Sequence, residues 1–228
     1  MNGNRSFSSQ SGLPPVVLGL LISNALVFLW QQMGGSLAPV FYFGLWPLGM
    51  PEVATAPLGV SQAPGFHVWQ LVSYAFLHGS MLHLFANMFA LWMFGVQIEN
   101  LWGSRPFAFY YFFCIVGAGL IQLVVASVAA GQGDVYPTIG ASGGVFGILL
   151  AFGMMFPNQM IFLLFPPIPM KAKYFVLLYG AFELWAGFTG SLSGVAHFAH
   201  IGGMIFGFAL IQYWRGRLPI KPKHRLHW

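Results

Sequence analysis

The chain has 228 residues, of which 57% are hydrophobic, 18% are aromatic and only 6% are charged. A soluble domain carries about 25% charged residues, and the apolar content here, with 24 Phe and 8 Trp, exceeds what a core of this length can bury. The net charge of +5 lacks the clustered basic surface that binds nucleic acid. The composition excludes a water-soluble enzyme and predicts an all-α membrane protein.

Six apolar stretches approach the length of about 20 residues that a membrane-spanning helix needs. In chain order they cover residues 15–31, 81–98, 106–130, 141–156, 173–188 and 195–214. The connection over residues 34–80 is long and contains no Lys or Arg, which predicts interfacial helices. We therefore expect one six-helix transmembrane domain over residues 15–214, with cytoplasmic tails at 1–14 and 215–228.

The basic residues test this arrangement, because Lys and Arg gather in cytoplasmic loops. All of them fall on one side of the six predicted spans: Arg5, Arg105, Lys171, Lys173, Arg215, Arg217, Lys221, Lys223 and Arg225. A count of five or seven spans breaks this pattern. The charges therefore predict a multi-pass protein of the cell (inner) membrane with both termini in the cytoplasm.

Polar side chains lie at one depth in three of the predicted spans. Such groups are expensive in hydrocarbon and are therefore candidates for function. His83 and Asn87 share one face at the start of the second span, Ser142 begins the fourth, and His197 and His200 lie in the first two turns of the sixth. At about 1.5 Å rise per residue, these groups lie within roughly 10 Å of the outer boundary. The pattern predicts one polar pocket that opens outward.

Acyl transfer is the chemistry that fits this pocket, because it needs a hydroxyl nucleophile, a base and donors for the oxyanion. Ser142 is the candidate nucleophile and His200 the candidate general base. The Ser142 backbone N–H at a helix N-terminus, the His83 imidazole and the Asn87 amide are candidate oxyanion donors. The glycines beside the serine allow another helix and a substrate backbone to come close.

An acid that orients the histidine is not expected. The four carboxylates of the chain are Glu52, Glu99, Asp134 and Glu183, and none falls in the second, fourth or sixth span near the pocket. The sequence therefore predicts a Ser–His dyad. Glu183, in the middle of the fifth span, could line a water cavity or a substrate gate, or could make structural hydrogen bonds.

Three motifs on three helices resemble those of the rhomboid intramembrane serine proteases. Gly-x-Ser-Gly matches Gly140 to Gly143, His-x-x-x-Asn matches His83 to Asn87, and Ala-His-x-x-Gly matches residues 199–203. The span order and the long first outer loop also agree. The resemblance implies a six-helix rhomboid-like bundle, Ser142 as nucleophile and His200 as base, and transmembrane protein substrates that enter past the fifth helix.

Two positions depart from the family pattern. Gln70 follows Trp69 in the first outer loop, where many members carry a Trp-Arg pair. Phe146 stands where an aromatic residue, commonly Tyr, packs against the catalytic histidine. The first change alters the bonding groups inside the loop, and the second keeps the ring but loses its hydroxyl.

Other interpretations remain open for single features. Ser142 with the Gly143-x-x-x-Gly147 pattern also suits close helix packing. His83, His197 and His200 could bind a metal or haem, although no acidic ligand motif accompanies them. His197 and His78 are better interpreted as structural or interfacial residues than as catalytic ones. We expect no metal and no cofactor.

Two rival functions belong to other classes. One is a catalytically inactive relative that holds membrane clients, against which the intact serine and histidine argue. The other is a small-solute or metal carrier, which the lack of inverted repeats disfavours. The expected partners are therefore transmembrane protein substrates and the lipid bilayer, and the single cysteine, Cys114, excludes an intramolecular disulfide.

Overall fold

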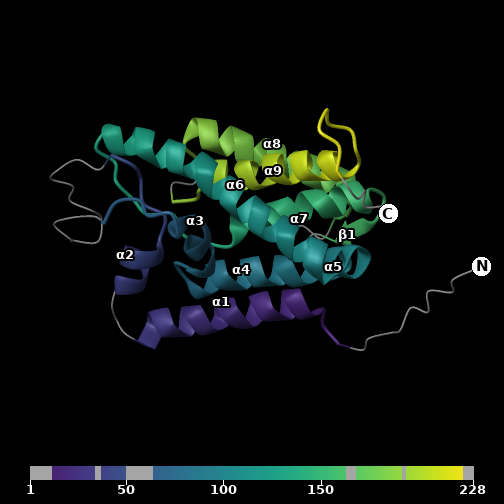
Figure 1. Cartoon of the computed structure of the whole chain (residues 1–228), viewed down its shortest axis with the longest axis horizontal. Coiled ribbons are helices and arrows are strands. Elements are labelled where there is room, and N and C mark those ends of the chain that lie inside the picture. Colours follow the sequence, from purple (N-terminus) through teal and green to yellow (C-terminus); the bar gives the residue numbers. More distant parts are fainter. Residues whose placement is uncertain (1–11, 34–36, 50–63, 163–167, 192–193, 223–228) are drawn as a thin grey trace, which may run out of the picture.

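A computed structural model of the chain describes residues 12–33, 37–49, 64–162, 168–191 and 194–222, which are mostly helical (Figure 1). The elements are α1 (Pro15–Met33), α2 (Ala38–Phe43), α3 (Gln70–Ser73), the 3-10 turn η1 (Tyr74–Phe76), α4 (Met81–Ala90), the π turn η2 (Leu91–Gly95), α5 (Val96–Trp102), α6 (Ser104–Gly131), α7 (Ser142–Met155), β1 (Met160–Phe162), β2 (Pro169–Lys171), α8 (Ala172–Thr189) and α9 (His197–Trp214). With α4, η2 and α5 counted as one segment, the long helices coincide with the six predicted stretches to within a few residues at each end.

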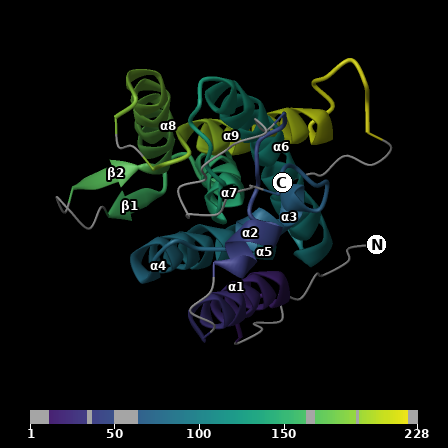
Figure 2. The same ribbon diagram turned by 90° about the vertical axis from the view of Figure 1, so that its left-hand side faces the viewer.

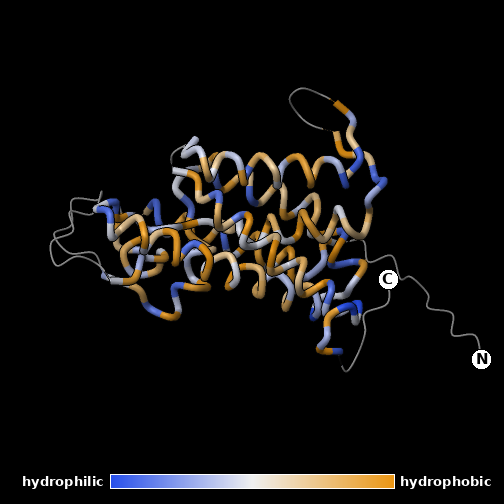
Figure 3. The backbone as a smooth tube through the Cα atoms, turned by 90° about the horizontal axis from the view of Figure 1, so that it is seen from above, coloured by the Kyte–Doolittle hydropathy of each residue, from blue (hydrophilic) through white to orange (hydrophobic). Residues whose placement is uncertain are grey.

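Within the described ranges, three segments are long and apolar enough to cross a membrane: Pro15–Met33, Met81–Trp102 and Ser104–Gly131. A fourth helix, Ser142–Met155, is apolar but shorter. Figure 3 shows apolar residues along the middle of the helices and more hydrophilic residues toward their ends. The chain is a multi-pass membrane protein, and spanning by α7, α8 and α9 remains a prediction.

The central helix of the bundle is α7. It contacts α4, η2, α5, α6, α8 and α9, and most of its side chains are buried (Figure 2). Glycines make this packing possible because they carry no side chain. A Cβ on Gly143 would lie 2.5 Å from the Ala118 Cβ, and Gly203 packs directly on the Gly143 carbonyl. The small residues in the serine motif thus bring α6 and α9 against α7.

Successive long helices alternate in direction. The first residues of α4, α7 and α9 lie at the end of the bundle that also carries α2 and α3 (Figure 1). The described bases lie toward the other end, at the start of α6, the start of α8 and after α9: Arg105, Lys171, Lys173, Arg215, Arg217 and Lys221. Arg5, Lys223 and Arg225 fall outside the described residues. Which end faces the cytoplasm remains a prediction.

A small hairpin corrects the all-α expectation. Strands β1 and β2 pair antiparallel between α7 and α8, with Met160 opposite Lys171. The α7 helix ends before Pro157, so the chain beyond needs other partners for its backbone groups. Ile161 is buried in this strand, while its neighbours Met160 and Phe162 are exposed. Alternation of buried and exposed residues suits a strand.

The first long connection contains short helices, as predicted, although residues 34–36 and 50–63 lie outside the described part. Backbone hydrogen bonds link Leu45 and Thr138 in both directions, at 2.9 and 2.8 Å. The Gly140 N–H donates to the Tyr74 carbonyl at 2.9 Å. The first connection thereby holds the segment that leads into α7.

Candidate active site

Ser142 and His200 form a hydrogen-bonded pair. The Ser142 Oγ lies 2.8 Å from the His200 Nε2. Ser142 is the first residue of α7 and is half-buried, whereas His200 lies in the first turns of α9 and is only 7% exposed. The packing of α7 on α9 therefore brings together two residues 58 positions apart in the chain, at the distance that proton transfer requires.

Phe146 fixes the plane of the His200 ring. The two rings stack with centroids 4.2 Å apart and an angle of 6° between their planes. Phe146 lies one helical turn after Ser142 on α7, so the same helix supplies the hydroxyl and the surface against which the imidazole rests. Tyr179 of α8 covers the Phe146 ring in turn, with centroids 4.9 Å apart.

Glu183 also belongs to this site, so the prediction that no acid would lie beside His200 is wrong. Its Oε2 lies 2.8 Å from the His200 Nδ1 and 2.6 Å from the His197 Nδ1. Glu183 is 3% exposed in the middle of α8, which packs against α9. The partners are 14 and 17 residues apart and lie on different helices, so no local spacing reveals the contact.

The far side of His197 is also bonded. Its Nε2 lies 3.1 Å from the Ser191 carbonyl oxygen, just beyond the end of α8. Together these contacts form a chain from Ser142 through His200, Glu183 and His197 to Ser191. His197, interpreted from the sequence as structural or interfacial, thus reaches the site through the carboxylate.

Glu183, His197 and His200 are also a set of side chains that could hold a metal ion, with all ligand atoms within 4.8 Å of one another. Two of these separations, 2.6 and 2.8 Å, are hydrogen-bond distances. Ligands that each lie about 2.0–2.2 Å from a tetrahedral zinc ion stand farther apart than this. Hydrogen bonding accounts for the arrangement without a metal.

His83 faces Ser142 across Gly140. Gly140 has a φ of +127°, and a Cβ there would lie 2.8 Å from the His83 Nε2 and 3.8 Å from the Ser142 Oγ. Only glycine suits both this backbone conformation and this space. The Gly79 N–H points at the His83 Nδ1 at 3.5 Å, which leaves the Nε2 edge of the ring on the side of the serine.

The Asn87 amide is turned toward its own helix. Its Nδ2 donates to the His83 carbonyl at 2.9 Å, and Asn87 is 5% exposed. The site therefore brings Ser142, His200, His83, Phe146, Gly140 and Gly143 together, while the Asn87 amide supports His83 from the turn below. Beside His83, burial and then the His83 imidazole lower the pKa of His78, in the loop before α4, to about 4.

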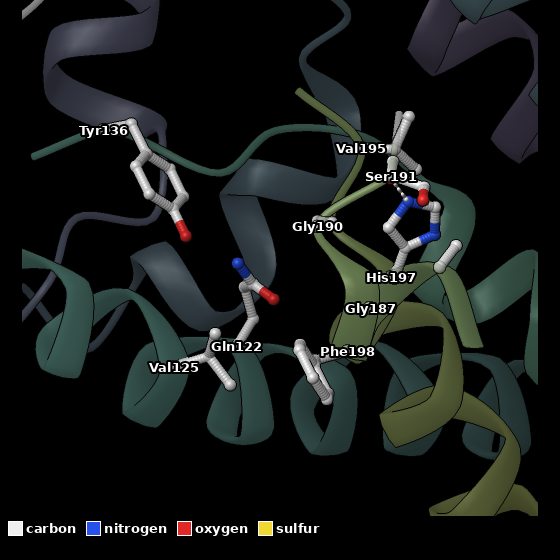
Figure 4. Close-up of a pocket in the computed structure, with 11 residues that line it drawn as sticks. Gln122, Val125, Tyr136, Gly187, Gly190, Ser191, Val195, His197 and Phe198 are labelled. Carbon is white, nitrogen blue, oxygen red and sulfur yellow. Dashed lines mark hydrogen bonds between the residues drawn. The ribbon is translucent and has the colours of Figure 1, made fainter. Parts of the chain in front are cut away.

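A pocket of about 220 Å³ lies on the other face of His197, where the end of α8 meets the start of α9 and the middle of α6. Figure 4 shows His197, Gln122 and Tyr136 around it, with the hydrogen bond from His197 to Ser191 at its edge. Sequence reasoning did not find this pocket, because its walls come from three separate helices and two loops.

Gln70 makes two side-chain hydrogen bonds within the first long connection. It is fully buried, its Oε1 accepts the Trp46 N–H at 3.2 Å, and its Nε2 donates to the Gly65 carbonyl at 3.2 Å. The Trp69 indole donates to the Tyr42 carbonyl at 3.2 Å. The neutral Gln70 amide thus joins two parts of this connection.

Fold and site together define a class: a multi-pass helical membrane protein with a Ser–His pair at the buried N-terminus of its central helix. The model of the Rhomboid domain family matches residues 65–217. This match covers more than half of the chain, which therefore belongs to the rhomboid family.

Several curated relatives are similar over most of the chain. The mitochondrial presenilin-associated rhomboid-like protein of Rattus norvegicus is 29% identical over 95% of this chain and 54% of its own length. Mitochondrial Rhomboid protein 1 of Saccharomyces cerevisiae is 28% identical over 84% of this chain and 60% of its own. Rhomboid protease GlpG of Photorhabdus laumondii is 25% identical over 96% of this chain and 67% of its own. The chain spans about half the length of the first of these relatives.

Proposed function

We propose that this rhomboid is an intramembrane serine endopeptidase that cleaves transmembrane protein substrates near the outer membrane face. The observation that carries the proposal is the 2.8 Å contact between the Ser142 Oγ and the His200 Nε2 at the start of α7. Family membership and similarity to a protein named as a rhomboid protease support it.

The geometry suits a two-step acyl transfer. His200 Nε2 accepts the Ser142 proton as Oγ attacks the scissile carbonyl, and it then donates that proton to the leaving amine. Water hydrolyses the acyl-enzyme with the same base. The oxyanion needs donors at the start of α7, where helix N–H groups have no intrahelical partner. The Ser142 N–H and the His83 Nε2 edge lie on this side, and the Asn87 Nδ2 donates to the backbone carbonyl of His83.

The substrate class follows from depth and surroundings. The 14 residues of α7 extend roughly 21 Å, less than the ~30 Å hydrocarbon core, so the start of a helix that reaches the opposite face lies below the membrane surface. A substrate helix must unwind there to expose a carbonyl. Exposed Leu177, Trp185 and Phe188 on α8 support a lipid-facing outer helix beside which substrates enter.

The test uses purified protein in proteoliposomes with a model transmembrane substrate. We expect wild type to cleave the substrate and to react with a fluorophosphonate probe, which requires an activated serine. Ser142→Ala and His200→Ala should abolish both reactions, because the first removes the nucleophile and the second the base. Ser23→Ala, a serine in α1 whose hydroxyl bonds the Leu20 carbonyl, is the matched control and should remain active.

Two outcomes contradict the proposal. Substrate binding without cleavage by wild type would favour the inactive client-binding alternative. Cleavage that disappears with a strong chelator and returns with zinc would favour a metal enzyme.

A further inference from the structure

We propose that Glu183 and His197 act as a pair of positioning residues for His200, so that the site works through four side chains rather than a Ser–His dyad. The inference rests on the proposed function, in which His200 is the base. It is carried by one carboxylate oxygen, the Glu183 Oε2, which contacts both imidazoles at 2.8 and 2.6 Å.

The contact at His200 selects the tautomer that catalysis requires. The base must present an unprotonated Nε2 to the Ser142 hydroxyl, so its single proton must reside on Nδ1. Glu183 accepts that Nδ1–H at 2.8 Å in a buried site. The same contact stabilises the imidazolium that forms when Nε2 takes the serine proton. Phe146 sets the ring plane, and Glu183 sets the rotation of the ring within it.

The contact at His197 fixes a second proton. The Ser191 carbonyl can only accept, so the His197 Nε2 at 3.1 Å carries a hydrogen. One further proton lies between the His197 Nδ1 and the Glu183 Oε2. If it resides on His197, an imidazolium faces a carboxylate; if it resides on Glu183, both partners are neutral. The pair has zero net charge in either case, which avoids an unpaired buried charge.

This shared proton links the pair to the reaction. When His200 becomes positively charged, the shared proton can move toward the His197 Nδ1. Glu183 is then a carboxylate, and its negative charge stabilises the His200 imidazolium. No bond other than N–H and O–H changes, and the proton stays within the pair. A buried acid without His197 would have to carry its charge alone or take up a proton permanently. His197 thus allows Glu183 to become negatively charged when His200 takes up the serine proton.

A purely structural clamp between α8 and α9 predicts different results. Loss of a clamp lowers stability and leaves the turnover of the remaining folded protein unchanged. Loss of a positioning residue lowers kcat and probe labelling of the protein that remains folded, while KM changes little. Neither Glu183 nor His197 takes part in substrate binding in the proposed mechanism. A fall in kcat of the folded protein at unchanged KM therefore indicates a positioning role, and an unchanged kcat indicates a structural clamp.

The experiment measures kcat, KM, fluorophosphonate labelling of Ser142 and Tm for Glu183→Gln, which keeps the shape of the side chain and loses its charge. In a soluble triad, replacing the acid by its amide lowers kcat by about 10⁴-fold. We expect a loss of about 10²- to 10⁴-fold here, with KM within about two-fold of wild type. Ser23→Ala, which removes a hydroxyl from α1 and none from the chain of contacts around His200, is again the control and should keep wild-type kcat.

Two substitutions of the second histidine provide an independent readout should Glu183→Gln fail to fold. His197→Asn places an amide N–H near the position of Nδ1 but cannot hold the shared proton, and His197→Leu removes the donor. We expect kcat to fall by about 10-fold in the first and further in the second, as for a lost supporting hydrogen bond near a reacting group.

The proposal is overturned if folded Glu183→Gln turns over within about three-fold of wild type, or if both His197 variants keep wild-type kcat. Those results leave the proposed function intact, provided that Ser142→Ala is inactive. Cleavage by Ser142→Ala, or no cleavage by wild type, would instead refute the function itself.

Discussion

At the scale of single residues, the candidate site depends on one glycine. Gly140 combines a φ of +127° with a position against the His83 ring, directly before the Ala141–Ser142 step into α7. A side chain there has to displace His83 or the segment that the Tyr74 carbonyl holds. The glycine of the motif thus sets the distance between the proposed oxyanion donor and the nucleophile.

Gly140→Ala should therefore reduce activity far more than backbone strain at this position would alone. The positive φ costs about 1–3 kcal/mol, and the new Cβ would meet the His83 Nε2 at 2.8 Å. We expect fluorophosphonate labelling to slow by about 10²-fold or more, the value of one oxyanion donor in soluble proteases. Gly133→Ala is the matched control, since Gly133 has a φ of +94° but nothing within 4 Å of its Cβ. Equal labelling of the two variants would show that the loss of activity comes from backbone strain and not from the contact with His83.

Individual residues also show the limits of sequence reasoning. The motifs predicted the neighbourhood of Ser142, His200 and His83, because each lies near the start of a helix and shares one depth. Glu183 lies mid-helix, and its partners approach only through the packing of α8 on α9. The signal present in the sequence was an acid inside an apolar span, which requires a partner but does not identify one.

At the scale of elements, hydropathy located the long helices because each must satisfy its own backbone in lipid. It did not reveal the β1–β2 hairpin, which lies outside those apolar segments. It also did not reveal how α1 is attached. Glu99 of α5 is 2% exposed, and its two oxygens accept the N–H groups of Val16 and Val17 at 3.0 and 2.8 Å. The carboxylate thus caps the free N-terminus of α1.

Glu99→Leu should loosen α1 without altering the site. It leaves two N–H groups without their acceptor and removes the 2.7 Å bond from the Ser104 hydroxyl. We expect the free energy of unfolding in detergent micelles to fall by about 2–5 kcal/mol, from the cost of unpaired buried groups and the lost dipole interaction. Ser104→Ala, which removes only one of these bonds, should lose about 1 kcal/mol. Unchanged stability of Glu99→Leu would exclude the capping role. Labelling of Ser142 well below the unfolding temperature should stay at the wild-type rate.

At the scale of the whole molecule, charge and site lie toward opposite ends. The serine, both site histidines and the short helices of the first connection share one end of the bundle, and the described bases share the other (Figure 1). Since bases are retained on the cytoplasmic side, the same argument that predicts cytoplasmic termini predicts a site that opens outward. Orientation and site depth are therefore tested together.

The orientation can be tested by cysteine labelling, because the one cysteine of the native chain is buried and should not react. Cys114 is free and 0% exposed, so a membrane-impermeant maleimide should not modify the unaltered protein. Asp134→Cys places a thiol at an exposed position between α6 and α7, and Arg217→Cys places one at an exposed position after α9. In intact cells we expect labelling of Asp134→Cys, while Arg217→Cys should react only after the membrane is permeabilised. The reverse pattern would put the site on the cytoplasmic face. Labelling of both variants in intact cells would mean that an even number of spans separates the two positions, rather than the predicted three (α7, α8 and α9).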